Sequence, residues 1–247
     1  MILEGAPRCR RSVVCAIARS GREANPRHLI RGAWFHRSSW EGWAERFTSH
    51  GYAVCVPGWP GEAPTAEQVR RDPGPLRDLG LTALTAHYET IVRTFDNPPV
   101  LVGHSAGGLI AQHFLGAGLG RAAVAHAPLQ AGGVPTAGPG RGRRDRPARP
   151  GTRASSKLPR ARFRPVVANT AGAEEATRLF DRYAVPAPLR LLADLGLDRT
   201  PAGPAGTVVD TANTARGPLL LVSGQEDRLA PDAVTRSAYK RYGDSSA

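Results

Sequence analysis

Hydrophobic residues follow two alternating patterns along the chain. Short apolar runs that predict buried strands lie at 28–30, 52–56, 100–102, 122–125 and 218–223. Apolar residues spaced three or four positions apart predict helices at 40–50, 81–95, 106–115, 173–183 and 232–242. Because strands that alternate with helices at this spacing form βαβ units, we expect an α/β fold with a mostly parallel sheet.

Two segments depart from this pattern. Residues 1–26 are irregular, with at most one short strand near 13–17. Residues 136–166 are rich in Arg, Pro and Gly, and without apolar periodicity we expect them to form a loop that buries no core. The predicted organisation is therefore 1–26, 27–135, 136–166, 167–217 and 218–247, with 27–135 and 218–247 sharing one core.

The charge of the chain is concentrated in these two segments. A formal net charge of +12 ordinarily suggests an anionic partner such as nucleic acid. Residues 1–31 hold seven Arg and two Glu (net +5), and residues 136–166 hold nine Arg, one Lys and one Asp (net +9), so the rest of the chain sums to −2. We therefore expect no nucleic-acid partner. A mean hydropathy of −0.31 also disfavours a membrane protein.

Cysteine usage favours a reducing compartment. Cys9, Cys15 and Cys55 match neither a disulfide framework nor a zinc motif, so we expect a cytoplasmic protein with no metal or other cofactor. A signal peptide over 8–18 is the alternative, but its apolar run is short and follows Glu4.

The pentapeptide Gly103-His104-Ser105-Ala106-Gly107 lies between a predicted strand and a predicted helix. In that context G-x-S-x-G forms a sharp turn that exposes the serine, and a side chain at either glycine would crowd the turn. The turn would also leave the Ala106 amide at a helix N-terminus, where it can stabilise an oxyanion. We predict that Ser105 is a nucleophile; the alternative is a serine that only caps the helix.

A candidate acid follows the last predicted strand. Asp227 lies three residues after Gly224, in a loop from which a carboxylate could orient a catalytic histidine. Glu226 and Asp232 are nearby alternatives, and Asp227 could also serve only as a turn residue.

These motifs, together with Arg31-Gly-Ala-Trp34 and the 53–62 stretch, resemble the α/β-hydrolase superfamily, in particular its serine esterases and lipases. The resemblance implies that Ser105 is the nucleophile and Asp227 the acid, in the family's chain order. It further implies that the amides of Ala33 and Ala106 form the oxyanion hole.

The same resemblance implies a helical cap within 167–217 and a small-molecule ester as substrate. The family usually has His-Gly where this chain has Arg31-Gly32, a departure that we expect to affect the oxyanion loop.

The family's catalytic histidine follows the acid. The histidines of this chain are at 28, 36, 50, 87, 104, 113 and 126, and none follows Asp227. We therefore expect a C-terminally incomplete fold and weak or absent turnover, since a serine without a proton acceptor is a poor nucleophile. His126 is an alternative base, whereas His104 is expected to pack at the elbow and His36 to lie in the pocket or at the surface.

Two other hypotheses come from different classes. The chain could be a non-catalytic pseudoenzyme or binding protein that presents residues 136–166 to an acidic partner. It could also be the product of a decayed or misread coding sequence, because Arg outnumbers Lys 31 to 2 and the family pattern is lost in residues 1–26, in 136–164 and after Asp227.

Overall fold

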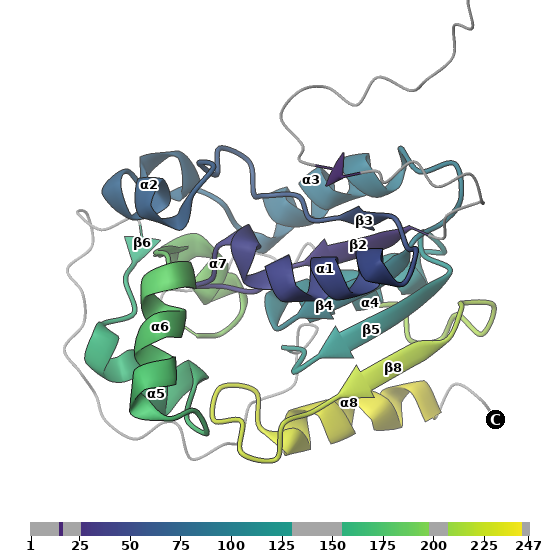
Figure 1. Cartoon of the computed structure of the whole chain (residues 1–247). Coiled ribbons are helices and arrows are strands. Elements are labelled where there is room, and N and C mark those ends of the chain that lie inside the picture. Colours follow the sequence, from purple (N-terminus) through teal and green to yellow (C-terminus); the bar gives the residue numbers. More distant parts are fainter. Residues whose placement is uncertain (1–14, 17–25, 130–154, 198–206, 244–247) are drawn as a thin grey trace, which may run out of the picture.

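The computed structural model describes residues 15–16, 26–129, 155–197 and 207–243 (Figure 1). Most of the predicted irregular segment 1–26 and of the basic segment 136–166 lies outside the described residues.

Six strands form the central sheet, in the order β1-β3-β2-β4-β5-β8. Neighbouring strands are parallel, except that β1 runs antiparallel to β3. The mostly parallel sheet predicted from the sequence is therefore confirmed. The strands are β1 (Cys15–Ala16), β2 (Arg27–Ile30), β3 (Val54–Cys55), β4 (Val100–His104), β5 (Ala122–His126) and β8 (Leu219–Val222).

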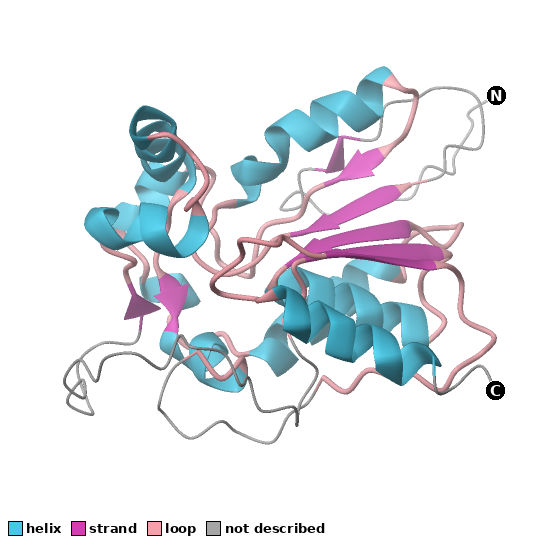
Figure 2. Ribbon diagram, turned by 90° about the horizontal axis from the view of Figure 1, so that it is seen from below, coloured by secondary structure: helices cyan, strands magenta, loops and turns pink. Residues whose placement is uncertain are grey.

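Helices cover both faces of this sheet (Figure 2). One face carries α1, and the other carries α3, α4 and α8, while α2 lies in the connection between β3 and α3. The helices are α1 (Glu41–Ser49), α2 (Ala66–Arg71), α3 (Leu81–Val92), α4 (Ala106–Gly116) and α8 (Asp232–Gly243), with short 3-10 helices at Arg37–Trp40 and Gly74–Leu76.

Alternate residues of a strand point to opposite faces of the sheet. Leu29 and Val102 pack with Trp40 in a cluster under α1, whereas Ile30 and Leu101 belong to the larger cluster beneath α3 and α4. Because side chains of both faces are buried, apolar residues are adjacent in these strands, at Leu29–Ile30 of β2 and Val100–Val102 of β4, rather than alternating with polar ones.

The order of the strands reverses beside β2, with β3 on one side and β4 on the other. Loops that leave β2 and β4 therefore turn to opposite sides and leave a crevice at the carboxyl ends of the strands, where sheets of this kind bind ligands. Residues 31–34 follow β2 and Ser105 follows β4, so both border this crevice.

A cap of helices and a small antiparallel sheet lies beyond the carboxyl ends of the strands, at the left of Figure 1. Its helix at Ala173–Tyr183 has the bounds predicted from the sequence. The cap comprises β6 (Ser155–Ser156), α5 (Arg160–Val167), α6 (Ala173–Tyr183), β7 (Ala187–Pro188) and α7 (Leu189–Asp194).

The prediction of a loop over 136–166 is wrong at its C-terminal end, where α5 forms. Phe163 is the one residue of α5 that is fully buried, and a single buried residue leaves no periodicity to detect. Contacts with α6 hold the helix instead. The rings of Phe163 and Phe180 lie 5.3 Å apart, and Arg160 pairs with Asp181.

Two smaller differences concern the region between β2 and α3. The strand predicted at 52–56 is only the two-residue β3, and α2 was not predicted because six residues are too few to show a period. The capping box that Thr65 and Gln68 form at its N-terminus is the signal that could have revealed it. Among the described residues, no helix is long and apolar enough to cross a bilayer.

Candidate active site

Ser105 occupies a sharp turn between β4 and α4. Its backbone has φ 55° and ψ −117°, a conformation that a residue with a side chain rarely adopts. Backbone hydrogen bonds impose it: the Ser105 amide donates to His126 O at 3.0 Å, and the Ser105 carbonyl accepts from Gly108 N at 2.9 Å. The predicted strand–turn–helix context of the serine is therefore present.

The two elbow glycines lie where a side chain has no room. A Cβ on Gly103 would lie 2.1 Å from the carbonyl oxygen of Gly107, and a Cβ on Gly107 would lie 2.0 Å from that of Ile30. Both distances are well below any normal contact with backbone, so the close approach of α4 to β4 and β2 requires glycine at both positions.

The first turn of α4 carries one predicted oxyanion donor. Ala106 is the first residue of the helix and is 1% exposed. The first amides of an α-helix have no partner within the helix and carry its positive end. The Ala106 amide therefore adjoins Ser105 with its N–H available to a ligand.

The loop after β2 carries the other predicted donor, Ala33, which lines the pocket. A Cβ on Gly32 would lie 2.8 Å from the Cβ of Ser105, so the loop backbone passes directly against the serine. Trp34 then turns the chain with a φ of 64°, and its carbonyl accepts from Val185 N of the cap at 2.9 Å.

Asp227 lies in the loop after β8 and also lines the pocket. Its Oδ1 accepts hydrogen bonds from the amides of Leu229 and Ala230, each at 2.8 Å, and its own amide donates to Gly224 O at 3.2 Å. These bonds hold the carboxylate in one orientation.

Of the alternative acids, Asp232 is engaged elsewhere. Its carboxylate accepts from Ser223 Oγ and Arg236 Nε at 2.5 Å each, and it does not line the pocket. Glu226 does line the pocket, so it remains a competitor of Asp227.

Two histidines lie at the ends of β4 and β5. The ring of His104 lines the pocket and lies 5.6 Å from the ring of His126 and 6.2 Å from that of Phe35. Burial, the largest cause, and the nearby His126 together lower the pKa of His104 to about 4, although Asp227 opposes the shift. His104 is therefore neutral near pH 7. His126 is exposed and does not line the pocket.

His36, expected in the pocket or at the surface, is in neither place. It is 1% exposed, and its Nε2 lies 3.1 Å from Ala63 O and its Nδ1 2.9 Å from Ser38 Oγ. Burial lowers its pKa. His36 thus joins the loop after β2 to the loop after β3.

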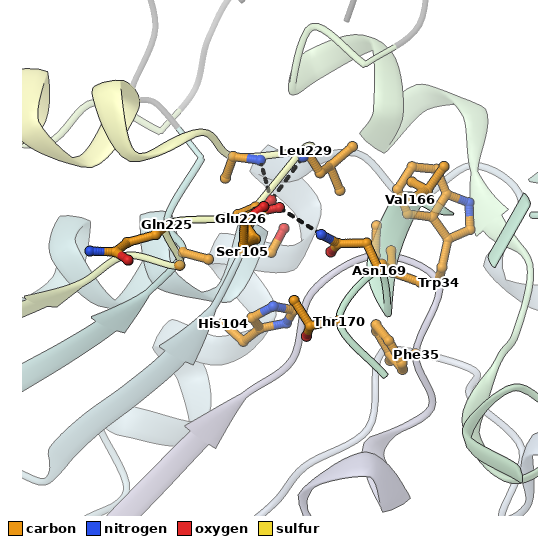
Figure 3. Close-up of a pocket in the computed structure, with 16 residues that line it drawn as sticks. Trp34, Phe35, His104, Ser105, Val166, Asn169, Thr170, Gln225, Glu226 and Leu229 are labelled. Atoms are coloured by element: carbon orange, nitrogen blue, oxygen red, sulfur yellow. Dashed lines mark hydrogen bonds between the residues drawn. The ribbon is translucent and has the colours of Figure 1, made fainter. Parts of the chain in front are cut away.

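The pocket has a volume of about 460 Å³ and is walled by core and cap together (Figure 3). Aromatic and aliphatic side chains form much of its wall, while polar groups gather around Ser105 and the loop after β8. The lining residues are Ala33, Trp34, Phe35, His104, Ser105, Ala127, Val166, Val167, Asn169, Thr170, Gly224, Gln225, Glu226, Asp227, Leu229 and Ala230.

The cap residues of this pocket were missed from the sequence. Val166 is the last residue of the segment predicted to be a loop, whereas Val167, which ends α5, and Asn169 and Thr170 begin the region predicted as the cap. The side chain of Asn169 donates to the carbonyl of Glu226 at 2.8 Å, which links the cap to the loop of the predicted acid (Figure 3). No local sequence pattern predicts such a contact, because it joins residues 57 positions apart.

The described residues contain no group of three or more His, Cys, Asp or Glu side chains that could hold a metal ion. The chemistry available in the pocket is that of a serine hydroxyl, two carboxylates, a neutral imidazole and backbone amides.

Among solved structures, the chain resembles an extracellular α/β-hydrolase from a Paenibacillus species, with a TM-score of 0.58 and 16% identity over 88% of this chain and 86% of that one. It also resembles a monoacylglycerol lipase from Paleococcus ferrophilus, with a TM-score of 0.56 and 16% identity over 87% of this chain and 79% of that one. The pyrethroid hydrolase PytH gives a TM-score of 0.54 and 15% identity over 89% and 85%. Likenesses at these identities show a shared fold.

In sequence, no curated protein matches the chain. A family model does: the one described as the alpha/beta hydrolase family matches residues 29–246, from β2 through α8. Both the fold and the strand–turn–helix setting of Ser105 agree with this match, and the chain therefore belongs to the alpha/beta hydrolase family.

Proposed function

We propose that this protein is a serine hydrolase that cleaves small-molecule esters by acyl transfer to Ser105. The observation that carries the proposal is the strained backbone of Ser105 at the wall of a partly apolar pocket, against the loop that carries Ala33. Strain of this kind persists only where the surrounding structure imposes it, and it is concentrated at functional sites.

The proposed reaction begins with attack of Ser105 Oγ on the carbonyl carbon of the ester. The negative charge that develops on the carbonyl oxygen would be stabilised by the amides of Ala33 and Ala106, which flank the serine. The alcohol leaves with a proton, and water then hydrolyses the acyl-enzyme and releases the carboxylic acid product from Ser105. The Asp227 carboxylate would orient or stabilise the group that carries the proton.

We expect slow turnover. Among the described residues, no histidine ring is hydrogen-bonded to Ser105 Oγ, and the low pKa of His104 makes it a weak base. A site that keeps only its oxyanion donors and binding contacts typically retains about 10³–10⁴-fold acceleration over water.

A fluorophosphonate probe tests the proposal directly, because it forms a covalent bond with an activated serine. We expect the wild type to be labelled and Ser105→Ala not to be labelled. Ser223→Ala is a matched control, since Ser223 lies at the end of β8 with its hydroxyl bonded to Asp232, and it should be labelled like the wild type. Equal labelling of wild type and Ser105→Ala would exclude Ser105 as the nucleophile.

Hydrolysis of p-nitrophenyl esters of increasing acyl length would then define the substrate class. Pockets that bind small molecules typically have volumes of roughly 300–1,000 Å³, and this one has about 460 Å³. We therefore expect activity to rise with acyl length and then to fall once the chain exceeds the pocket.

A second candidate function is binding of an anionic partner through the basic segment, which carries a net charge of +9 over 136–166. Deletion of 136–154 would remove six of its nine Arg and leave α5 in place. If the candidate is right, the deletion should abolish a salt-sensitive affinity for heparin. Unchanged heparin affinity would reject it.

A further inference from the structure

A buried ion pair lies beneath the loop that carries Ala33. Arg31 Nη2 lies 2.6 Å from Glu62 Oε1, and the two side chains are 1% and 0% exposed. The guanidinium also stacks on the indole of Trp59, with Cζ 3.4 Å from the ring centroid. Burial lowers the pKa of Arg31, and the Glu62 carboxylate opposes this, so Arg31 remains a cation.

Arg31 also contacts the backbone of its own loop. Its Nη1 donates to the carbonyl oxygen of Gly32 at 3.2 Å. In a trans peptide the carbonyl and the next N–H point in opposite directions. A Gly32 carbonyl held toward the guanidinium therefore turns the Ala33 N–H away from it, and the loop and turn hydrogen bonds of the described residues include none donated by that amide.

Glu62 is itself fixed in place. Its Oε2 accepts from Trp59 N at 3.2 Å, and its amide donates to Trp59 O at 2.9 Å, so the carboxylate uses one oxygen for the turn and the other for Arg31. Because both charges are buried, any arrangement that separates them leaves a charge unpaired, which is costly. The guanidinium therefore has one favoured position under the loop.

We propose that Arg31 is a positioning residue that locks the Gly32–Ala33 peptide, so that the Ala33 N–H faces the oxyanion formed at Ser105. The planar guanidinium is suited to this role because it contacts a carboxylate, a carbonyl and an aromatic face at once, which an ammonium group cannot do. The expected effect of Arg31 on the oxyanion loop is thus to order it. This inference rests on the proposed function of Ser105.

Three variants distinguish a role of Arg31 in positioning the loop from a role only in the stability of the fold. The double variant Arg31→Met with Glu62→Leu removes both charges while keeping apolar volume beside Trp59, and such replacements are often neutral for stability. Arg31→Lys keeps the charge but loses the stacked, forked contact. Arg27→Met is the control, because Arg27 lies at the other end of β2, where its guanidinium stacks 3.9 Å from the ring centroid of Tyr52.

We expect the double variant and Arg31→Lys to lower kcat and the rate of fluorophosphonate labelling by about 10–100-fold, less than the complete loss of an oxyanion donor. KM should stay within about twofold, since the ground-state ester is bound by the same pocket walls. Arg27→Met should label like the wild type. Wild-type labelling rates in both Arg31 variants, or an equal loss in Arg27→Met, would overturn the proposal.

Crystal structures of the wild type and the double variant give a readout that does not depend on activity. We expect the Gly32–Ala33 peptide to be rotated, or to occupy two orientations, only in the double variant. An unchanged peptide would overturn the positioning role. If instead wild type and Ser105→Ala are labelled equally, the proposed function fails, and the crystal structures still decide whether Arg31 orders the loop.

Discussion

Gly107 and Gly108 are neighbours in α4 that differ in what a new side chain would meet. A Cβ on Gly107 would lie 2.0 Å from the carbonyl oxygen of Ile30, whereas a Cβ on Gly108 would lie 3.1 Å from the Cβ of Pro128. Since real Cβ contacts essentially never fall below 3.0 Å, Gly107→Ala must move α4 from β2 by about 1 Å.

The two substitutions share one favourable effect, because alanine stabilises a helix interior by about 1 kcal/mol relative to glycine. Overpacking typically costs about 1–3 kcal/mol, and Gly107→Ala should reach or exceed the upper end because backbone cannot rotate aside as a side chain can. The expected loss in the free energy of unfolding is therefore about 2 kcal/mol for Gly107→Ala and about zero for Gly108→Ala.

Urea-induced unfolding followed by far-ultraviolet circular dichroism measures both changes. Gly42→Ala in α1 is a control, since nothing lies within 4 Å of its added Cβ, and it should raise stability. Gly107→Ala should also slow labelling of Ser105, which begins the same turn. If Gly107→Ala and Gly108→Ala proved equally stable, the close approach of α4 to β2 would be refuted.

Three other predictions concern protonation and the pocket wall. Burial lowers the pKa of His28 to about 3 and of His104 to about 4. As the pH falls, these two histidines are therefore protonated in the unfolded chain before they are protonated in the folded one, and the free energy of unfolding should decrease as the pH drops from 6.5 to 4. In urea titrations at several pH values, His28→Leu and His104→Gln should each reduce that fall, and an unchanged pH profile would contradict the buried, neutral rings. Asp227→Asn keeps an acceptor for the loop amides but removes the charge, so it should slow labelling without loss of stability; Asp227→Ala should in addition destabilise the protein by about 1–2 kcal/mol in urea unfolding. Asn169→Ala removes the hydrogen bond to the carbonyl of Glu226 and should raise KM for a p-nitrophenyl ester about two- to tenfold with little change in kcat. A decrease confined to kcat would argue against a role of Asn169 in holding the pocket wall.

Local patterns in the sequence predicted much of the core. The helix at 106–115 and the strand at 100–102 were placed within two residues of α4 and β4, because the strand is short and fully apolar and the elbow glycines mark the turn between them. The strand at 122–125 agrees with β5 for the same reason. By contrast, α5 was missed because its stability comes from Phe163 packing against another helix, which composition does not reveal.

The sequence by itself determined the alternation of strands and helices and the serine turn, because each depends on residues that are neighbours along the chain. Only the tertiary structure decided how the pocket is walled and how its loops are held. Arg31 and Glu62 are 31 positions apart, and Asn169 and Glu226 are 57 apart. A buried charge or a side-chain amide binds a partner that is close in space, whatever its distance along the chain. These contacts therefore form only once the sheet has brought the ends of its strands together.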